Sequence, residues 1–292
     1  MSFTGVLTAL VTPLGEGGRE VDMVALGELC ERQIAAGVHG LIPCGTTGES
    51  PTLSTAEQVA VVRKVVAVAN KRVPVLAGAG SSSTAHAVEL ARAAREAGAD
   101  GVLAVTPYYN RPTQAGLEAH FRAIASEGEL PVVLYNVPGR TGVDLLPATV
   151  AALAREPRIV AIKEATGSIG RAQQLLQAAP GFTVLSGDDV TMLALWAVGA
   201  RGVISVLSNP APRETVTLWD HVQAGRWAEA RALNLRLQPL CDALFAESNP
   251  IPVKFAMSLL GQARLEYRLP LTHPSAKVQD QLGDALKGLG LL

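Results

Sequence analysis

Residues 160–167 read VAIKEATG, an apolar run that ends on Lys163 and continues with a glutamate, a threonine and a glycine. Short runs of continuous apolar residues are typical of parallel strands that are buried on both faces. An ammonium group is costly to bury without a partner, so the position of Lys163 at the end of an apolar run needs an explanation. Either Lys163 forms an ion pair with a carboxylate such as Glu164, or its amine reacts with a carbonyl substrate.

Similar apolar runs recur through the first three quarters of the chain, and segments with the 3.6-residue period of amphipathic helices separate them. Many of these helical segments open on Ser, Thr or Asp and close on Gly, as helix caps do. Eight strand-helix units predict an α/β fold, a (β/α)8 TIM barrel, for which about 250 residues are usual. The runs begin at Gly5, His39, Pro74, Gly101, Pro131, Ile159, Phe182 and Gly202.

An open, doubly wound sheet is the alternative fold, but the glycine-rich turns GTTGE and GAGSSS lack the GxGxxG fingerprint of a dinucleotide site. After Ala224 the pattern changes to helices without intervening strands. We therefore expect a catalytic barrel over residues 1–224 and a C-terminal helical domain over residues 225–292.

The chain of 292 residues has a formal net charge of -1, which leaves no basic field to attract nucleic acid or an acidic membrane surface. Its N-terminal apolar run lacks a preceding positive region and is too short to cross a membrane, so the expected location is the cytoplasm. The three cysteines and five histidines show neither a disulfide framework nor metal-ligand spacing. The sequence therefore predicts small-molecule chemistry without a metal or another cofactor.

Unusual polar residues cluster at the predicted C-terminal ends of the strands, where the active face of a TIM barrel lies. Of the six lysines, Lys163 alone ends a strand; the other five lie in helical or terminal segments, where a solvated charge is expected. The tyrosines Tyr108, Tyr109 and Tyr135 fall on the same face, although aromatic residues make up only 4% of the chain. This clustering favours the reactive amine over the ion pair.

A lysine that attacks a carbonyl needs a group to move protons, and Tyr135 on the neighbouring strand is the candidate. Free backbone N–H groups and hydroxyls around Thr46 and Thr47 suit one carboxylate, and the Arg140 guanidinium suits a second. Each residue also has a structural interpretation: Tyr135 as core filler, the threonines as helix caps, and Arg140 in a surface salt bridge. All of these structural roles together are improbable.

Seven motifs resemble, in order and spacing, the signatures of the dihydrodipicolinate synthase family, one of the pyruvate-dependent class I aldolases and lyases. They are GTTGES, VTPYYNRPTQ, LYNVPGRTG, AIKEATG, LSGDD, GVISV and ESNPIPVKFA, so the resemblance covers nearly the whole chain. It implies that Lys163 forms a Schiff base with pyruvate and that the derived enamine attacks L-aspartate 4-semialdehyde. The implied product is 4-hydroxy-tetrahydrodipicolinate, on the route to diaminopimelate and lysine.

The same resemblance implies the roles of the other site residues and the assembly. Thr46, Tyr135 and Tyr109 match a proton relay in which the last tyrosine comes from the neighbouring subunit of a homotetramer, a dimer of dimers. The remaining matches are Thr47 and Gly48 for the pyruvate carboxylate, Arg140 for the semialdehyde carboxylate, and Gly187 and Ile204 for the pocket wall.

Regulation by L-lysine is expected to be weak or absent. Lysine-inhibited members of the family line an interface pocket with residues such as His, Asn and Glu. None of the corresponding positions in this chain has a carboxylate to pair with the α-ammonium of lysine. These positions are Ser50, Thr55, Gln58, Ser82, His86 and Tyr108.

Three other functions compete with this one. The nearest is a sister activity, such as N-acetylneuraminate lyase, 2-keto-3-deoxygluconate aldolase or 4-hydroxy-2-oxoglutarate aldolase, but the paired threonines and Arg140 favour the synthase. A catalytically silent barrel that binds a small molecule is possible because fold alone does not prove activity. Metal-dependent aldol chemistry is disfavoured because the sequence lacks ligand spacing.

Overall fold

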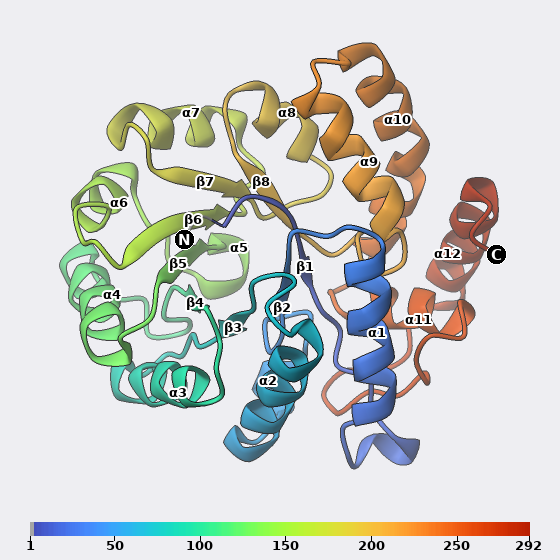
Figure 1. The fold of residues 1–292 in the computed structure, drawn as a ribbon, viewed down its shortest axis with the longest axis horizontal. Coiled ribbons are helices and arrows are strands. Elements are labelled where there is room, and N and C mark those ends of the chain that lie inside the picture. The colour runs from blue at the N-terminus through green and yellow to red at the C-terminus, as the bar shows by residue number, and fades with distance from the viewer. Residues whose placement is uncertain (1–2) are drawn as a thin grey trace.

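The computed structural model describes residues 3–292, and eight parallel strands form a single sheet in the order β2-β1-β8-β7-β6-β5-β4-β3. A parallel bridge between Leu41 and Val75 joins the two ends of this order, so the sheet closes into the predicted (β/α)8 barrel (Figure 1). Each predicted apolar run contains one strand. The strands are β1 (Gly5–Ala9), β2 (Gly40–Ile42), β3 (Leu76–Gly78), β4 (Gly101–Val105), β5 (Val132–Asn136), β6 (Ile159–Glu164), β7 (Thr183–Ser186) and β8 (Gly202–Ser205).

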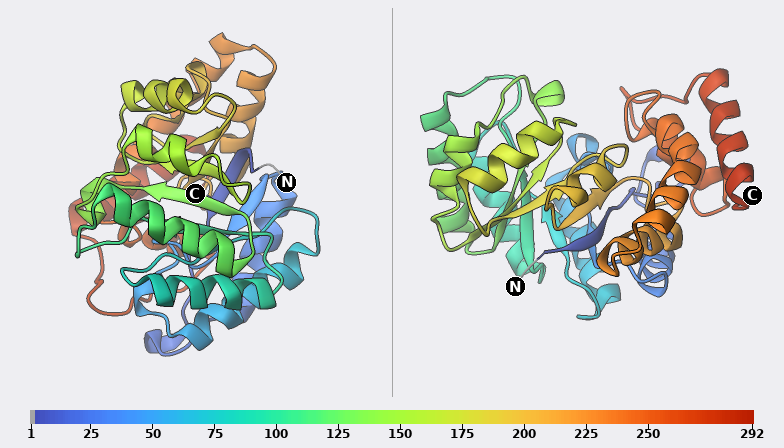
Figure 2. Two further views of the ribbon diagram at one scale, coloured as in Figure 1. Left: turned by 90° about the vertical axis from the view of Figure 1, so that its left-hand side faces the viewer. Right: turned by 90° about the horizontal axis from the view of Figure 1, so that it is seen from above.

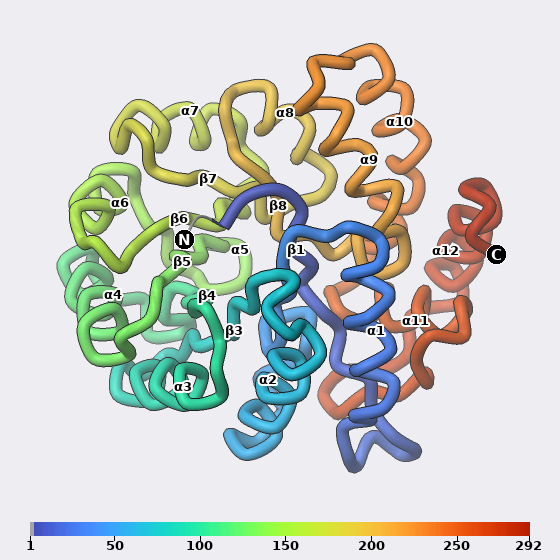
Figure 3. The backbone as a smooth tube through the Cα atoms, viewed as in Figure 1, coloured from blue at the N-terminus to red at the C-terminus, as the bar shows by residue number. Residues whose placement is uncertain are grey.

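A ring of helices surrounds the strands, and several begin at the capping residues that the sequence indicates (Figure 3). Ser54 and Glu57 form a capping box that satisfies two otherwise unpaired N–H groups at the start of α2. None of the helices in residues 3–292 is both long enough and apolar enough to cross a membrane. The barrel helices are α1 (Met23–Ala35), α2 (Thr55–Ala69), α3 (Thr84–Glu96), α4 (Gln114–Gly128), α5 (Pro138–Thr141), α6 (Pro147–Leu153), α7 (Ile169–Ala178), α8 (Met192–Ala197) and α9 (Pro212–Gln223), with short 3-10 turns η1 (Glu16–Gly18) and η2 (Ser50–Thr52).

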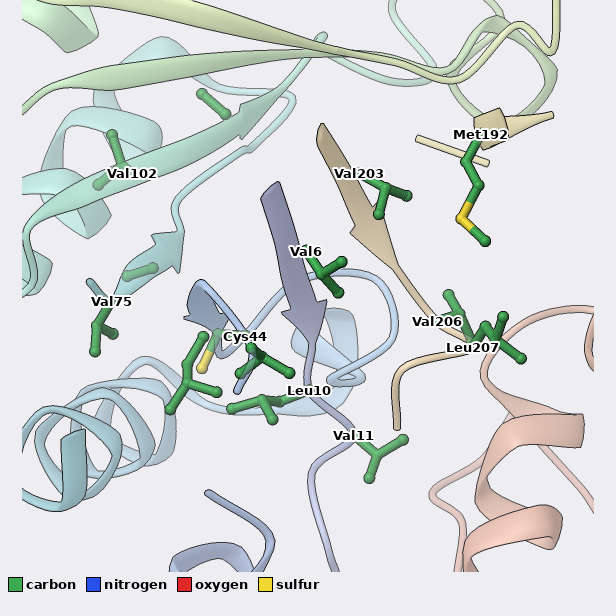
Figure 4. Close-up of a cluster of buried hydrophobic side chains, with 14 of the residues drawn as sticks. Val6, Leu10, Val11, Cys44, Val75, Val102, Met192, Val203, Val206 and Leu207 are labelled. Atoms are coloured by element: carbon green, nitrogen blue, oxygen red, sulfur yellow. The ribbon is translucent and has the colours of Figure 1, made fainter. Parts of the chain in front are cut away.

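Side chains alternate between two buried layers along each strand, because successive residues of a strand point to opposite faces. The outer layer lies between the strands and the helices, and Val6 and Val203 belong to it on the paired strands β1 and β8 (Figure 4). The inner layer fills the barrel, as in other TIM barrels. Its buried members are Phe3, Leu7, Ala9, Ile42, Leu76, Leu103, Val133, Tyr135, Val137, Ala161, Leu185 and Ile204.

The predicted C-terminal helical extension is confirmed: α10 (Trp227–Leu244), α11 (Ile251–Leu259) and α12 (Ala276–Leu289) lie along one side of the barrel (Figure 2). Apolar side chains of these helices, Leu240 and Met257 among them, belong to the same buried cluster as the outer layer of the barrel. The expected boundary after residue 224 falls between α9 and α10, and the division into two domains there stays a prediction.

The expectation that the five other lysines are solvated is wrong for Lys254. Its side chain on α11 is fully buried and forms an ion pair with Glu49, which is also buried. The amine lies 5.2 Å from the centroid of the Tyr267 ring. Burial lowers the pKa of Lys254, and the negative charge of Glu49 acts in the opposite direction. A buried lysine is tolerated here because a carboxylate from the loop after β2 compensates for its charge.

Candidate active site

Lys163 and Tyr135 lie side by side at the C-terminal ends of β6 and β5. They are partners in the parallel register of the two strands, and the Lys163 amine lies 4.2 Å from the centroid of the Tyr135 ring. The lysine is only 6% exposed. Glu164, the next residue, instead accepts hydrogen bonds from the Asn136 side chain and from the Thr166 N–H. Among the residues that the structure describes, no salt bridge includes Lys163, so the ion-pair interpretation of this stretch is wrong.

A polar network fixes the same two strand ends on the outer face of the barrel. The Asn136 amide donates to Asp144 at 2.9 Å and to Glu164 at 3.1 Å. Two nitrogens of Arg171 donate to the two oxygens of Asp144, and this contact holds the pKa of that carboxyl below its usual value. Because Asn136 and Glu164 directly follow Tyr135 and Lys163, the network helps to set the positions of Tyr135 and Lys163.

The GTTGE turn after β2 is closed by its own backbone. The Gly48 N–H donates to the Gly45 carbonyl and the Glu49 N–H to the Thr46 carbonyl, both at 3.1 Å. The Thr12 hydroxyl donates to the Gly48 carbonyl at 2.7 Å. A Cβ atom at Gly48 would lie 3.2 Å from the Thr12 hydroxyl oxygen, so glycine suits this close approach.

A small cavity of about 50 Å³ adjoins the Lys163 amine and brings together Thr46, Thr47, Tyr135 and Lys163. A larger cavity of about 360 Å³ lies next to it and is lined in part by Arg140. Thr46 lines both, so the two spaces adjoin. The structure thus places five of the predicted site residues around two adjoining cavities: Lys163, Tyr135, Thr46, Thr47 and Arg140.

The other predicted site residues lie at different distances from this opening. A Cβ atom at Gly187 would lie 3.0 Å from Cγ of Lys163, so the glycine leaves room beside the lysine stem. Ile204 is buried in the inner layer of the barrel and lines neither cavity. Tyr109 has a left-handed backbone with φ of 73° and is 93% exposed, and it lines neither cavity of its own chain.

Sequence reasoning gave no role to Asn249, which the structure brings to the site from the segment before α11. Its amide nitrogen donates to the Thr47 hydroxyl oxygen at 3.0 Å. Its backbone carbonyl accepts from Nη2 of Arg140 at 3.3 Å. The only signal in the sequence was the motif ESNPIPVKFA, in which Asn249 stands between a serine and a proline.

Within residues 3–292, no three His, Cys, Asp or Glu side chains gather closely enough to hold a metal ion. Cys44 lines both cavities, but it is 2% exposed and burial raises the pKa of its thiol to about 12. A thiol with this pKa stays protonated near neutral pH and is a poor nucleophile. Cys44 is therefore disfavoured as the nucleophile of this site.

Comparison with known proteins extends the likeness over the whole chain. Residues 2–289 match the family described as Dihydrodipicolinate synthetase family. The chain belongs to the dihydrodipicolinate synthetase family. The family match spans the barrel and the C-terminal helices alike, and it confirms the resemblance carried by the sequence motifs.

Individual members of the dihydrodipicolinate synthetase family are similar along their full lengths. The 4-hydroxy-tetrahydrodipicolinate synthase of Maridesulfovibrio salexigens is 48% identical over 294 residues and covers 100% of both chains. That of Geobacter sulfurreducens is 53% identical over 270 residues and covers 92% of each chain. A crystal structure of the chloride inhibited dihydrodipicolinate synthase from Acinetobacter baumannii, complexed with pyruvate, is 45% identical, with a TM-score of 0.96 and 100% of both chains covered.

Proposed function

We propose that the chain condenses pyruvate with L-aspartate 4-semialdehyde to give 4-hydroxy-tetrahydrodipicolinate, on the route to diaminopimelate and lysine. The observation that carries the proposal is the buried Lys163 amine beside Tyr135, in a cavity that Thr46 and Thr47 also line. Full-length relatives named 4-hydroxy-tetrahydrodipicolinate synthase favour this substrate pair over those of the sister aldolases.

The neutral Lys163 amine attacks the keto carbon of pyruvate, and the resulting carbinolamine loses one water to give an imine. Loss of a proton from the methyl group converts the imine into an enamine, whose carbon attacks the aldehyde carbon of the semialdehyde. The amino group of the semialdehyde then attacks the imine carbon, closes the ring and releases Lys163. Every step moves a proton, and the Tyr135 hydroxyl is the proposed group that gives and takes it, together with Thr46 and Tyr109.

The two carboxylates are proposed to bind in the two adjoining cavities. Thr47 and Gly48 form the proposed cradle of the pyruvate carboxylate: Thr47 lines the small cavity and donates to the carboxylate, and Gly48 shapes the turn, because its N–H donates to the Gly45 carbonyl. Arg140 lines the larger cavity and binds the semialdehyde carboxylate with two parallel hydrogen bonds. Gly187 leaves room for the lysine stem, and Ile204 supports the wall from within the barrel.

The proposed working form is a homotetramer, a dimer of dimers, in the cytoplasm. Tyr109 supports an assembly because its side chain is almost fully exposed and lies away from the cavity of its own chain. A large aromatic side chain in this position would be buried by a neighbouring subunit, where its hydroxyl would complete the relay.

The test of the function is the intact mass after borohydride reduction with pyruvate, combined with peptide mapping. We expect one reduced pyruvyl adduct on Lys163. If L-aspartate 4-semialdehyde is added after pyruvate but before borohydride, we expect this adduct to be lost. An adduct that the semialdehyde leaves in place would instead assign the chain to a sister aldolase. Absence of any adduct would overturn the proposed function.

Replacing Tyr109 with phenylalanine is expected to lower kcat about a hundredfold and to leave the pyruvate adduct intact, because only a proton-transfer group is lost. The decisive measurement mixes the Tyr109→Phe chain with a Lys163→Met chain under conditions of subunit exchange. If Tyr109 acts across an interface, mixed assemblies contain one site with both groups intact and regain activity. An unchanged kcat in the single variant would remove Tyr109 from the relay.

L-lysine is expected to inhibit only above about 1 mM, because a ligand ammonium bound in a desolvated pocket needs a carboxylate to replace its water. Five of the positions that would contact L-lysine line the same cavity of about 360 Å³ as Arg140, and the lining contains no Asp or Glu. They are Ser50, Thr55, Gln58, His86 and Tyr108. The measurement is steady-state turnover over a range of L-lysine concentrations at fixed pyruvate. Half-maximal inhibition below 1 mM would contradict the prediction.

A further inference from the structure

The C-terminal extension reaches the site through the residues from Asn249 to Lys254. Asn249 contacts Thr47 in the GTTGE turn, and Lys254 forms a fully buried ion pair with Glu49, the last residue of that turn. Glu49 adopts a left-handed backbone with φ of 55°. The turn is therefore held at two points by one short segment that lies about two hundred residues away in sequence.

The hydrogen bond between Asn249 and Thr47 has a direction with a chemical consequence. The amide nitrogen of Asn249 only donates, so the Thr47 oxygen accepts this bond and its own hydrogen must point elsewhere. In the part of the chain that the structure describes, the Thr47 hydroxyl is the donor of no hydrogen bond to the protein, and it accepts only the bond from Asn249. Thr47 is 2% exposed and Asn249 7% exposed, so water has little access to replace a missing partner.

We propose that Asn249 is a positioning residue that turns the Thr47 hydroxyl toward the carboxylate of the bound keto acid. The inference rests on the proposed function, in which Thr47 belongs to the pyruvate cradle. The Asn249 side chain fixes the rotation of the hydroxyl, and the ion pair of Lys254 with Glu49 keeps the segment against the turn. Thr47 then presents a ready donor, and no free energy is lost in reorienting it when the keto acid binds.

Asn249 also contacts the proposed semialdehyde site, through its backbone carbonyl and not through its side chain. The Asn249 backbone carbonyl accepts from Arg140, so a side-chain substitution leaves this contact possible. Asn249 variants should therefore separate the two substrates. Pyruvate binding should weaken, whereas the KM for the semialdehyde should stay the same.

The experiment measures the pyruvate concentration that gives half-maximal borohydride-trapped adduct, together with kcat and both KM values. For Asn249→Ala we expect this concentration to rise about tenfold, because the Thr47 hydroxyl is no longer held in place and its hydrogen bond to the charged ligand is weakened. The semialdehyde KM should stay within twofold of the parent value. Asn249→Asp keeps the shape but replaces the donor by an acceptor, and we expect a larger loss. Asn234→Ala on α10 is the matched control and should change neither quantity.

A double-mutant cycle with Thr47→Val decides whether Asn249 acts through Thr47. If it does, Asn249→Ala adds less than twofold to the loss already caused by Thr47→Val. The inference would be overturned if the losses of pyruvate affinity in the two single variants multiplied in the double variant. An equal rise in both KM values, or normal pyruvate affinity of Asn249→Asp, would also overturn it. Failure of the proposed function is distinguishable, because it would appear as a missing adduct or missing turnover in the unmodified protein.

Discussion

Replacing Lys163 with methionine is expected to lower kcat by at least about a thousandfold and to abolish the pyruvate adduct, because no other group at the site supplies an amine. The fold should survive, since the methionine side chain is apolar and the inner layer around position 163 is apolar as well. The measurements are kcat with both substrates, the intact mass after borohydride reduction, and the thermal midpoint Tm.

Two further variants make this result specific. Lys163→Arg keeps the positive charge but lacks a nucleophilic amine, so it should be as inactive as Lys163→Met. Lys287→Met, at an exposed position in the last turn of α12, should retain activity within about twofold of the parent, as surface changes usually do. Turnover within tenfold of the parent, with an adduct on another lysine such as Lys254, would transfer the nucleophilic role away from Lys163.

Replacing Lys254 with methionine is expected to destabilise the protein by about 3–5 kcal/mol, because it leaves the carboxylate of Glu49 buried without its partner. Both side chains are almost completely inaccessible to solvent, at 0% and 1% exposure. Methionine fills much of the same volume, so the loss is due to the uncompensated charge more than to a cavity. The free energy of unfolding in urea or guanidinium chloride is the quantity to compare.

The double variant Glu49→Gln with Lys254→Met provides the internal control. It removes both charges, so much of the lost stability should return. Arg72→Ala breaks an ion pair with Glu31 whose members are 44% and 55% exposed, and it should lower the free energy of unfolding far less than Lys254→Met does. If Lys254→Met lowered the free energy of unfolding no more than Arg72→Ala does, the buried pair would contribute no more stability than a surface pair.

The barrel was predictable from the sequence because parallel strands in a closed barrel are buried on both faces and therefore appear as short apolar runs. Each of the eight runs contains a strand, and Ser54 caps a helix as its residue type indicates. The meeting of Lys163 and Tyr135 was also predictable, because neighbouring parallel strands carry their C-terminal residues to the same end of the barrel.

The contribution of the C-terminal segment was not predictable, because Thr47 and Asn249 are 202 residues apart and no local pattern records a contact at that separation. Lys254 offered one signal that was missed. The helix α11 is buried at Pro252, Val253, Phe255, Ala256 and Met257, and a helix that is apolar on all sides lies inside a protein. A lysine within such a helix needs a buried carboxylate, which the sequence alone does not locate.

The alternation along β6 limits which changes in gene sequence this chain can accept. Lys163 lies inside the barrel and Glu164 joins the network outside it, and the two environments are one residue apart. Substitution of a nearby apolar residue preserves this arrangement. Deletion of a single codon between Ile159 and Ile162 would shift every later side chain of the strand to the opposite face, placing a glutamate beside Tyr135 and the lysine among the helices. Insertions and deletions should therefore be far rarer than substitutions in this strand among functional variants.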